Sequence, residues 1–382
     1  MTPQGTISED ERYRTSTQYR LWSFTRPSIH SLRTTTNQLA AENVREAVRR
    51  ARETRAVASA DVSEADTENS RPASAAPEGP PDVEVDCLTV EEELKLVMFY
   101  CRQTIQLGDH LKLPTEVKAT AIQYMKRFYI TNSLMTYDPA SILKTALFFA
   151  TKTENHYFRL TKFAEAIGKT KPEDVLASEF LLTQGLRFTF DVRHPFRALE
   201  GAVMEMQGMA NNTIPVHSTF EGRKPTSMAR RVKEAHGKAR EYLKTSALLT
   251  DVYFHYTPSQ IMTASLFIAD EELINWYMAT KLQEGSEVHG KVVKAVSDCA
   301  SMLQAIPPTA EPSAAERKDI AALGKKLKKC RNPEKIDLVG LQRAKREGEL
   351  AADDKIIKKR KLEREKSTKE GEDLFGPGIK KD

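Results

Sequence analysis

Cysteines and histidines are the first side chains to test for chemistry, because metal sites and nucleophilic catalysis both use them. Cys87, Cys101, Cys299 and Cys330 lack the paired spacing of a zinc site or a disulfide framework, and the eight histidines are scattered. A glycine-rich phosphate loop, a nucleophile elbow and paired catalytic carboxylates are also not recognisable. We therefore expect reduced thiols, no metal, no cofactor and no catalytic residue, in a protein that is not an enzyme.

Lys152 and Glu179 are the charged residues that we single out as candidate binding residues. Lys152 follows an apolar segment, where it would complement the dipole at a helix C-terminus by about 0.3–1 kcal/mol. Glu179 could be its salt-bridge partner, which would add about 0–1 kcal/mol if the pair is exposed. Residue type alone therefore favours a structural role for both.

The segment that precedes Lys152 occurs twice in the chain. Residues 137–150, YDPASILKTALFFA, return as residues 256–269, YTPSQIMTASLFIA, with Tyr, Pro, Ile, Leu, Phe and Ala in register. The offset of 119 residues is far longer than a solenoid repeat and close to the length of a domain. The sequence therefore predicts two tandem copies of one small fold.

Each copy of this segment is predicted to be a buried helix. Asp138 and Thr257 are good N-caps, and Pro139 and Pro258 follow at the first helical position, where no amide donor is needed. The residues behind these caps are apolar nearly all round, and a helix without a polar face must be surrounded by other helices. We therefore expect an all-α fold made of two bundles, each of about five helices.

Composition and helical periodicity divide the chain into five regions. We expect an N-terminal segment and helix (1–57), a disordered acidic, proline-rich linker (58–86), a first helical domain (87–192), a second (193–306), and a C-terminal helix with a basic disordered tail (307–382). Residues 187–192 alternate like a strand, but we interpret them as an extended link between the copies. No apolar run could span a bilayer and the N-terminus is no secretory signal, so no membrane partner is expected.

Several motifs together resemble the cyclin family, and most closely its cyclin H subfamily. They are Ser16–Phe24, Met125–Tyr129, Phe149–Lys152, Glu179–Leu182, His194–Arg197, Tyr256–Ile261 and Leu323–Cys330. The resemblance covers about residues 13–57 and 88–335. It implies two tandem cyclin boxes in a regulatory subunit that binds and activates a cyclin-dependent kinase of the CDK-activating class.

The resemblance also gives Lys152 and Glu179 a role. In cyclins, a Lys at the end of the central helix and a Glu two helices later reach the kinase backbone beside a mobile helix, whose catalytic Glu must pair with the ATP-binding Lys. Phe149 and Thr183 share helical faces with these two residues and are secondary candidates, although core packing explains Phe149 equally well. Copy two has Glu271 in place of Lys152, so only copy one is expected to bind the kinase in this way.

Further partners are implied by the same resemblance. They are a RING-type assembly factor and the core of the general transcription factor TFIIH, which would place the protein in the nucleus and link it to RNA polymerase II phosphorylation. Sequence-specific binding to nucleic acid is not expected. One alternative is another transcription-elongation protein with cyclin boxes. Another is a protein of the transcription factor IIB type, but the zinc ribbon of that class needs paired Cys-x-x-Cys motifs, which this sequence lacks.

Two segments keep more than one interpretation. In residues 316–382, Lys and Arg outnumber Asp and Glu by seven, and Lys358–Arg364 could be a nuclear localisation signal. Because acidic residues are interspersed, a solvated helical surface explains this segment at least as well. Trp22 and Phe24 are large apolar groups in a polar neighbourhood, and we expect them to fasten the N-terminal segment to a helical bundle or to the kinase.

Overall fold

A computed structural model describes residues 13–64, 85–168, 170–216, 224–282 and 286–331, with the side chains of 51–64 left out. Within these residues the chain forms helices joined by turns and extended links, and no β-strand. The predicted all-α fold is confirmed.

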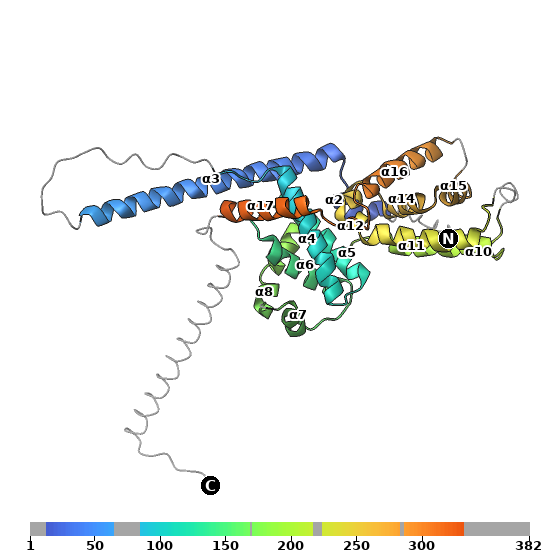
Figure 1. The fold of residues 1–382 in the computed structure, drawn as a ribbon, viewed down its shortest axis with the longest axis horizontal. Helices are drawn as coiled ribbons and strands as arrows, with labels where there is room; N and C mark the ends of the chain where they lie inside the picture. The colour runs from blue at the N-terminus through green and yellow to red at the C-terminus, as the bar shows by residue number, and fades with distance from the viewer. Residues whose placement is uncertain (1–12, 65–84, 169, 217–223, 283–285, 332–382) are drawn as a thin grey trace, which may run out of the picture. The chain divides into compact units, whose positions relative to one another are not determined.

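The first helical domain, the first box, is built around the first copy of the repeated segment. Its helices are α4 (Val90–His110), α5 (Thr115–Thr131), α6 (Pro139–Thr153), α7 (Leu160–Ile167), α8 (Pro172–Leu176) and α9 (Glu179–Gly185). Helix α6 packs against α4, α5, α8 and α9 (Figure 1). Its N-cap is Asp138, whose carboxylate accepts a hydrogen bond from the Ser141 amide at 3.1 Å. The central position expected of an all-apolar helix is therefore what the structure shows.

One helix of this box differs from its predicted form. The apolar periodicity of residues 172–186 predicts a single helix, but a turn at Ala177 and Ser178 divides them into α8 and α9. Ser178 is buried at this turn, and its hydroxyl lies 3.1 Å from the hydroxyl of Ser141 on α6. The break places Glu179 at the first position of a new helix that packs against α6.

The second box repeats the arrangement of a central helix packed among others. It contains α10 (Phe196–Ala210), α11 (Met228–Lys244), α12 (Ser246–Leu249), α13 (Val252–His255), α14 (Pro258–Ala269), α15 (Glu271–Ala279) and α16 (Glu287–Gln304). Helix α14 is the second copy of the repeated segment and packs against α10, α11, α15 and α16. Its N-cap is Thr257, which forms a capping box with Gln260. Both copies therefore form a capped, buried central helix, as predicted.

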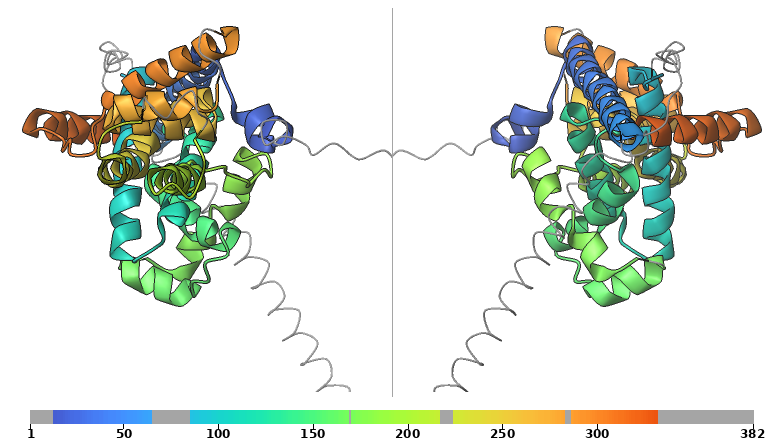
Figure 2. Two further views of the ribbon diagram at one scale, coloured as in Figure 1. Left: turned by 90° about the vertical axis from the view of Figure 1, so that its right-hand side faces the viewer. Right: turned by 90° about the vertical axis from the view of Figure 1, so that its left-hand side faces the viewer.

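A short N-terminal helix, α2 (Thr17–Trp22), is fastened to the link between the boxes. The Trp22 side chain is 1% exposed, and its indole Nε1 donates to Thr189 Oγ1 at 2.9 Å. The guanidinium of Arg127, on α5, lies 5.2 Å from the indole ring. In the side views of Figure 2, α2, in blue, lies next to the light-green chain that joins the boxes. Of the two alternatives for Trp22, the structure shows packing against the helical bundle.

The next helix, α3 (Arg26–Glu64), is longer than expected. It continues beyond residue 57, the predicted boundary, because the sequence has no glycine or proline between Pro27 and Pro72 to end it. Its side chains contact the first box through Asn37, which donates to the Leu88 carbonyl at 2.8 Å. Most of the predicted linker, residues 65–84, lies outside the described residues, as does the basic tail from 332 onward.

The last described helix, α17 (Ala314–Cys330), returns to the first box and lies beside α4 (Figure 1). Leu323, Leu327 and Cys330 are buried, and Lys326 Nζ lies 2.9 Å from a carboxylate oxygen of Glu92 on α4. The predicted C-terminal helix is therefore present, and it packs on the first box.

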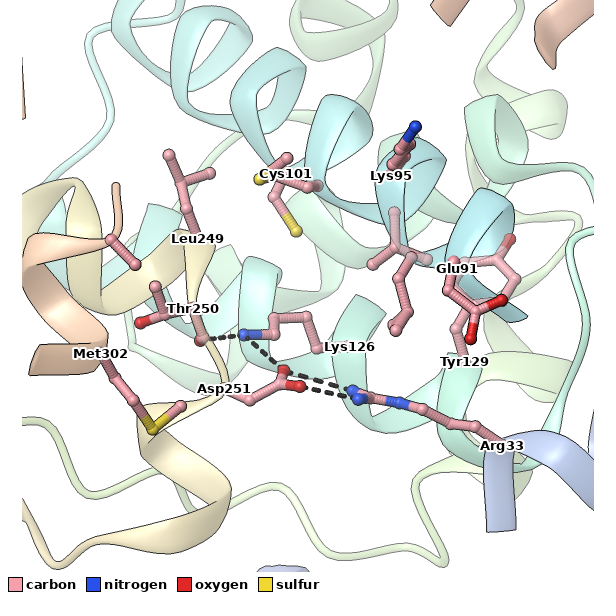
Figure 3. A pocket seen from close by; sticks show the side chains of 14 residues that line it. Arg33, Glu91, Lys95, Cys101, Lys126, Tyr129, Leu249, Thr250, Asp251 and Met302 are labelled. Atoms are coloured by element: carbon pink, nitrogen blue, oxygen red, sulfur yellow. Dashed lines mark hydrogen bonds and ion pairs between the residues drawn. The ribbon is translucent and has the colours of Figure 1, made fainter. Parts of the chain in front are cut away.

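Three charged side chains join α3, α5 and the turn between α12 and α13. Arg33 binds Asp251 with both terminal nitrogens, at 2.7 and 3.2 Å, and Lys126 Nζ lies 3.3 Å from Asp251 and donates to the Thr250 carbonyl (Figure 3). Burial raises the pKa of Asp251, but Lys126 and Arg33 outweigh burial and hold that pKa well below its usual value. The network forms one wall of a cavity of about 470 Å³. Because these charges bind one another, the network is suited to joining the two boxes.

Candidate functional site

The site predicted from the sequence is at the C-terminal end of α6, whose geometry is well defined. Lys152 is in the last turn of this helix, and the helix ends at the cap residue Glu154. Asn155 has a positive φ of 54°, in the left-handed region that Asn tolerates better than most residues. The amide of His156 donates back to the Thr151 carbonyl at 2.8 Å. The helix end thus has a defined backbone, which fixes the point from which the Lys152 side chain extends.

Lys152 and Glu179 form an ion pair between α6 and α9. Lys152 Nζ lies 2.7 Å from each carboxylate oxygen of Glu179. The side chains are 43% and 27% exposed, so the pair is at the surface. A surface ion pair of this kind contributes only about 0.2–1 kcal/mol. Either group could therefore exchange its partner for a group on another protein at little cost in stability.

Phe149 lies beneath the pair and belongs to the core. Its side chain is 8% exposed, and its ring centroid is 5.0 Å from that of Phe190 and 5.7 Å from that of Tyr124. The core-packing alternative therefore describes its surroundings in this chain. The ring of the adjacent Phe148 lies 4.9 Å from Lys152 Nζ, within reach of a cation–π interaction.

Thr183 is half-buried on α9, one turn after Glu179. Its hydroxyl donates to the carbonyl of Phe180 at 2.9 Å, and its own carbonyl accepts from the amide of Phe188 at 3.0 Å. The structure thus brings Lys152, Glu179 and Thr183 to one surface formed by the end of α6 and by α9.

Exposed aromatic residues accompany this surface and were not predicted as site residues. Tyr157, Phe180 and Phe188 are 86%, 60% and 63% exposed. Large exposed aromatic groups are typical of binding surfaces, where they supply most of the apolar contact. Phe188 also has a positive φ of 54°, a strained backbone conformation for a bulky residue.

The sequence holds a signal for one of these aromatic residues. Leu182 and Leu186, four residues apart, are fully buried and define the inner face of α9. Phe180 is two residues before Leu182, about 200° around the helix, and so faces away from the core. Tyr157 and Phe188 are outside regular helices, where periodicity carries no information.

The second box does not repeat the ion pair. Helix α14 ends at Ala269, and Glu271, which corresponds to Lys152, is an exposed residue in the first turn of α15. Asp270 caps α15 and forms a two-bond pair with Arg231, which also reaches Glu272 at 2.5 Å. The corresponding surface of the second box thus has Glu271 in place of the lysine, beside a cluster of Arg231, Asp270 and Glu272.

Two other kinds of site were sought in the part of the chain that the structure describes. No group of three or more His, Cys, Asp or Glu side chains there could hold a metal ion, and none of the helices there has the length and apolar character needed to cross a membrane.

Comparison with known families and proteins identifies the fold. Residues 95–191 match the cyclin N-terminal domain and residues 194–304 match the cyclin C-terminal domain. The chain is 35% identical to cyclin CCL1 of Saccharomyces cerevisiae over 74% of this chain and 64% of CCL1. It is 29% identical to cyclin mcs2 of Schizosaccharomyces pombe over 85% of this chain and 86% of mcs2. It is 28% identical to cyclin-H of Xenopus laevis over 75% of this chain and 85% of that cyclin-H. The chain thus spans a little less than two thirds of CCL1.

Two solved structures have the same fold. The CAK complex of Chaetomium thermophilum bound to ATP-γ-S contains a chain that is 39% identical, with a TM-score of 0.72 over 90% of this chain and 96% of that one. The yeast TFIIK complex of Kin28, Ccl1 and Tfb3 contains a chain that is 31% identical, with a TM-score of 0.51 over 76% and 100%. The chain therefore belongs to the cyclin family, in the group that contains cyclin H, CCL1 and mcs2.

Proposed function

We propose that this chain is the regulatory cyclin subunit of a CDK-activating kinase complex and that it activates its kinase through the surface around Lys152 and Glu179. The observation that carries the site is the exposed ion pair between Lys152 and Glu179, held at the ends of two packed helices, with Glu271 in place of the lysine in the second box. The similarity to chains of the CAK and TFIIK complexes supports the kind of assembly.

The proposed contact exchanges one set of partners for another. On binding, Lys152 would donate to backbone carbonyls of the kinase, and Glu179 would accept from its amides, in place of their mutual pair. Phe180 and Phe188 would lose their exposed area to the kinase and exclude water from these polar contacts. The kinase helix held there carries the Glu that must pair with the ATP-binding Lys. The cyclin thus supplies position and no catalytic group.

The wider assembly is part of the same proposal. A third subunit, an assembly factor of RING type, and the TFIIH core would join the cyclin and its kinase, and the complex would phosphorylate RNA polymerase II in the nucleus. The support is the similarity to a chain of the TFIIK complex, in which Tfb3 is the third named component.

The experiment is a pair of double variants with matched ion pairs. Lys152→Ala with Glu179→Ala removes the proposed contact, and we expect the dissociation constant for the kinase to rise at least about hundredfold, because two interface anchors are lost. Lys281→Ala with Glu205→Ala is the control. That pair is on the second box, joins α10 to the turn that follows α15, and has side chains 45% and 29% exposed, almost the same as the candidate pair.

Both double variants are measured by isothermal titration calorimetry with the purified kinase, and far-ultraviolet circular dichroism confirms that each remains helical. A further single variant, Glu271→Ala, tests the corresponding position of the second box and should bind like the wild type. Equal affinities of the two double variants would show that Lys152 and Glu179 are not the anchors.

A further inference from the structure

A chain of polar side chains leads from the second box to the end of α6. The hydroxyl of Tyr253, on α13, lies 3.0 Å from His194 Nδ1, and His194 Nε2 lies 2.8 Å from Thr120 Oγ1, on α5. Thr120 Oγ1 in turn donates to Glu154 Oε1 at 2.6 Å. Tyr253 and Thr120 are 3% and 0% exposed, so most of the chain is shielded from water.

The direction of each hydrogen bond follows from the number of protons available. The Thr120 hydroxyl has one proton and gives it to the Glu154 carboxylate, which can only accept. Thr120 must therefore accept from His194 Nε2–H, which leaves Nδ1 without a proton and able to accept from Tyr253. Burial, with the nearby Arg127 charge, lowers the pKa of His194 to about 3, so the neutral ring that this pattern needs is the form present at neutral pH. Four groups thus form one directed chain of donors.

The chain ends two residues from the proposed kinase anchor. Glu154 is the C-cap of α6, and its amide donates to the carbonyls of Ala150 and Lys152. The side chain of Glu154 therefore ties the last turn of α6 to α5 and, through His194, to the second box. Neither Glu154 nor His194 is part of the exposed surface formed by Lys152 and Glu179.

We propose that Thr120, Glu154 and His194 are positioning residues that hold the last turn of α6, so that the second box sets the placement of Lys152 for the kinase. This inference rests on the proposed function of Lys152. On this proposal the second box takes part in kinase binding without anchors of its own, because it fixes the place from which the first box presents Lys152.

The test removes the central hydroxyl and keeps the shape of the side chain. Thr120→Val breaks the bonds to both Glu154 and His194, and we expect kinase affinity to fall about fivefold, the loss expected for one hydrogen bond. Thr120→Ser keeps the hydroxyl and should restore affinity. Thr104→Val is the matched control, because Thr104 is 1% exposed and its hydroxyl donates within α4, to the Tyr100 carbonyl at 2.8 Å.

A double-mutant cycle separates positioning from general destabilisation. In a Lys152→Ala background, Thr120→Val should change kinase affinity by less than about twofold, because its effect passes through Lys152. An undiminished fivefold effect in that background would overturn the proposal, and so would wild-type affinity of Thr120→Val. If Thr120→Val does not fold, Glu154→Ala, which removes the last acceptor at a half-buried position, takes its place in the cycle.

Hydrogen exchange gives a readout that does not need the kinase. The amides of Glu154, Asn155 and His156 are bonded in the last turn of α6, and Thr120→Val should make them exchange faster while Thr104→Val should not. Unchanged exchange at these amides would overturn the positioning role. If the wild-type protein fails to bind the kinase, the proposed function is refuted. The exchange result alone then decides whether the hydrogen bonds of Thr120 hold the last turn of α6.

Discussion

Replacing Asp251 by Ala should destabilise the fold more than replacing either residue that binds it. Lys126 and Arg33 have side chains 4% and 11% exposed and carry two positive charges, and among the residues that the structure describes both form their ion pair with Asp251. Removing Asp251 leaves both cations buried without an anion. Replacing Lys126 by Met leaves the two-bond Arg33–Asp251 pair, whose net charge is zero, and the Met side chain fills a similar volume to that of Lys.

The structure gives the size of the difference. Breaking a buried ion network by removing one partner costs about 3–5 kcal/mol, and the 25% exposure of Asp251 places Asp251→Ala near about 3 kcal/mol. Replacing Lys126 by Met should cost about 1 kcal/mol or less, because a hydrophobic side chain can replace a buried ion at little cost. With an m-value of about 3 kcal/mol/M in urea, the midpoints should fall by about 1 M and about 0.3 M.

Urea unfolding followed by circular dichroism measures both midpoints, and pH adds a second condition. The pKa of Asp251 is held below its ordinary 3.8, so its ionised form stabilises the fold above pH 3.8 and loses this effect as pH falls further. The gap between the wild type and Asp251→Ala should therefore narrow below about pH 4. Midpoints of the two variants within about 0.2 M of each other at pH 7 would refute the charge-balance argument.

Three further predictions concern other parts of the fold. Burial lowers the pKa of His194 from 6.5 to about 3, so between these pH values only the unfolded chain takes up a proton at this residue, and the free energy of unfolding should fall by up to about 1.4 kcal/mol for each unit that pH is lowered. In urea titrations between pH 6.5 and 5, His194→Gln should lack this slope. Equal slopes for the variant and the wild type would contradict a buried, neutral His194. A Cβ on Gly185 would overlap the Phe128 ring, whereas one on Gly201 in α10 meets no atom within 4 Å, so in thermal melts Gly185→Ala should cost about 1–3 kcal/mol and Gly201→Ala should add about 0.5–1 kcal/mol. Shifts of the same sign would count against this packing. Trp22→Ala should detach α2, which limited proteolysis would detect as faster cleavage there with both boxes intact; an unchanged cleavage rate would mean that other contacts hold the helix.

The central helices could be predicted from sequence because their signals are local. The caps Asp138 and Thr257 satisfy the first amides of α6 and α14, and the proline after each cap needs no partner. The extension of α3 to Glu64 was missed, because the acidic composition of that region outweighed the absence of helix-breaking residues. The turn at Ser178 was missed because it depends on contact with α6.

The candidate site was predictable in part. The family resemblance located Lys152 and Glu179, and the structure brings them together at 2.7 Å. Phe149 had two interpretations on sequence, since its position on α6 is equally close to the anchors and to the core, and packing against Tyr124 placed it in the core. The exposed Phe188 had no sequence signal, because its conformation depends on how the chain leaves α9.

The sequence by itself determined the duplicated segment, the capped apolar helices and the presence of Lys152 in the first copy, with Glu271 at the matching position of the second. These features depend on residues close together in the sequence, because the spacing of apolar residues determines which face of a helix is buried. Tertiary structure decided which distant groups meet: Arg33 with Asp251, and Thr120 with His194. The physical reason is that periodicity specifies an apolar face but not the partner packed on it, so hydrogen bonds and ion pairs between helices become defined only when the helices pack.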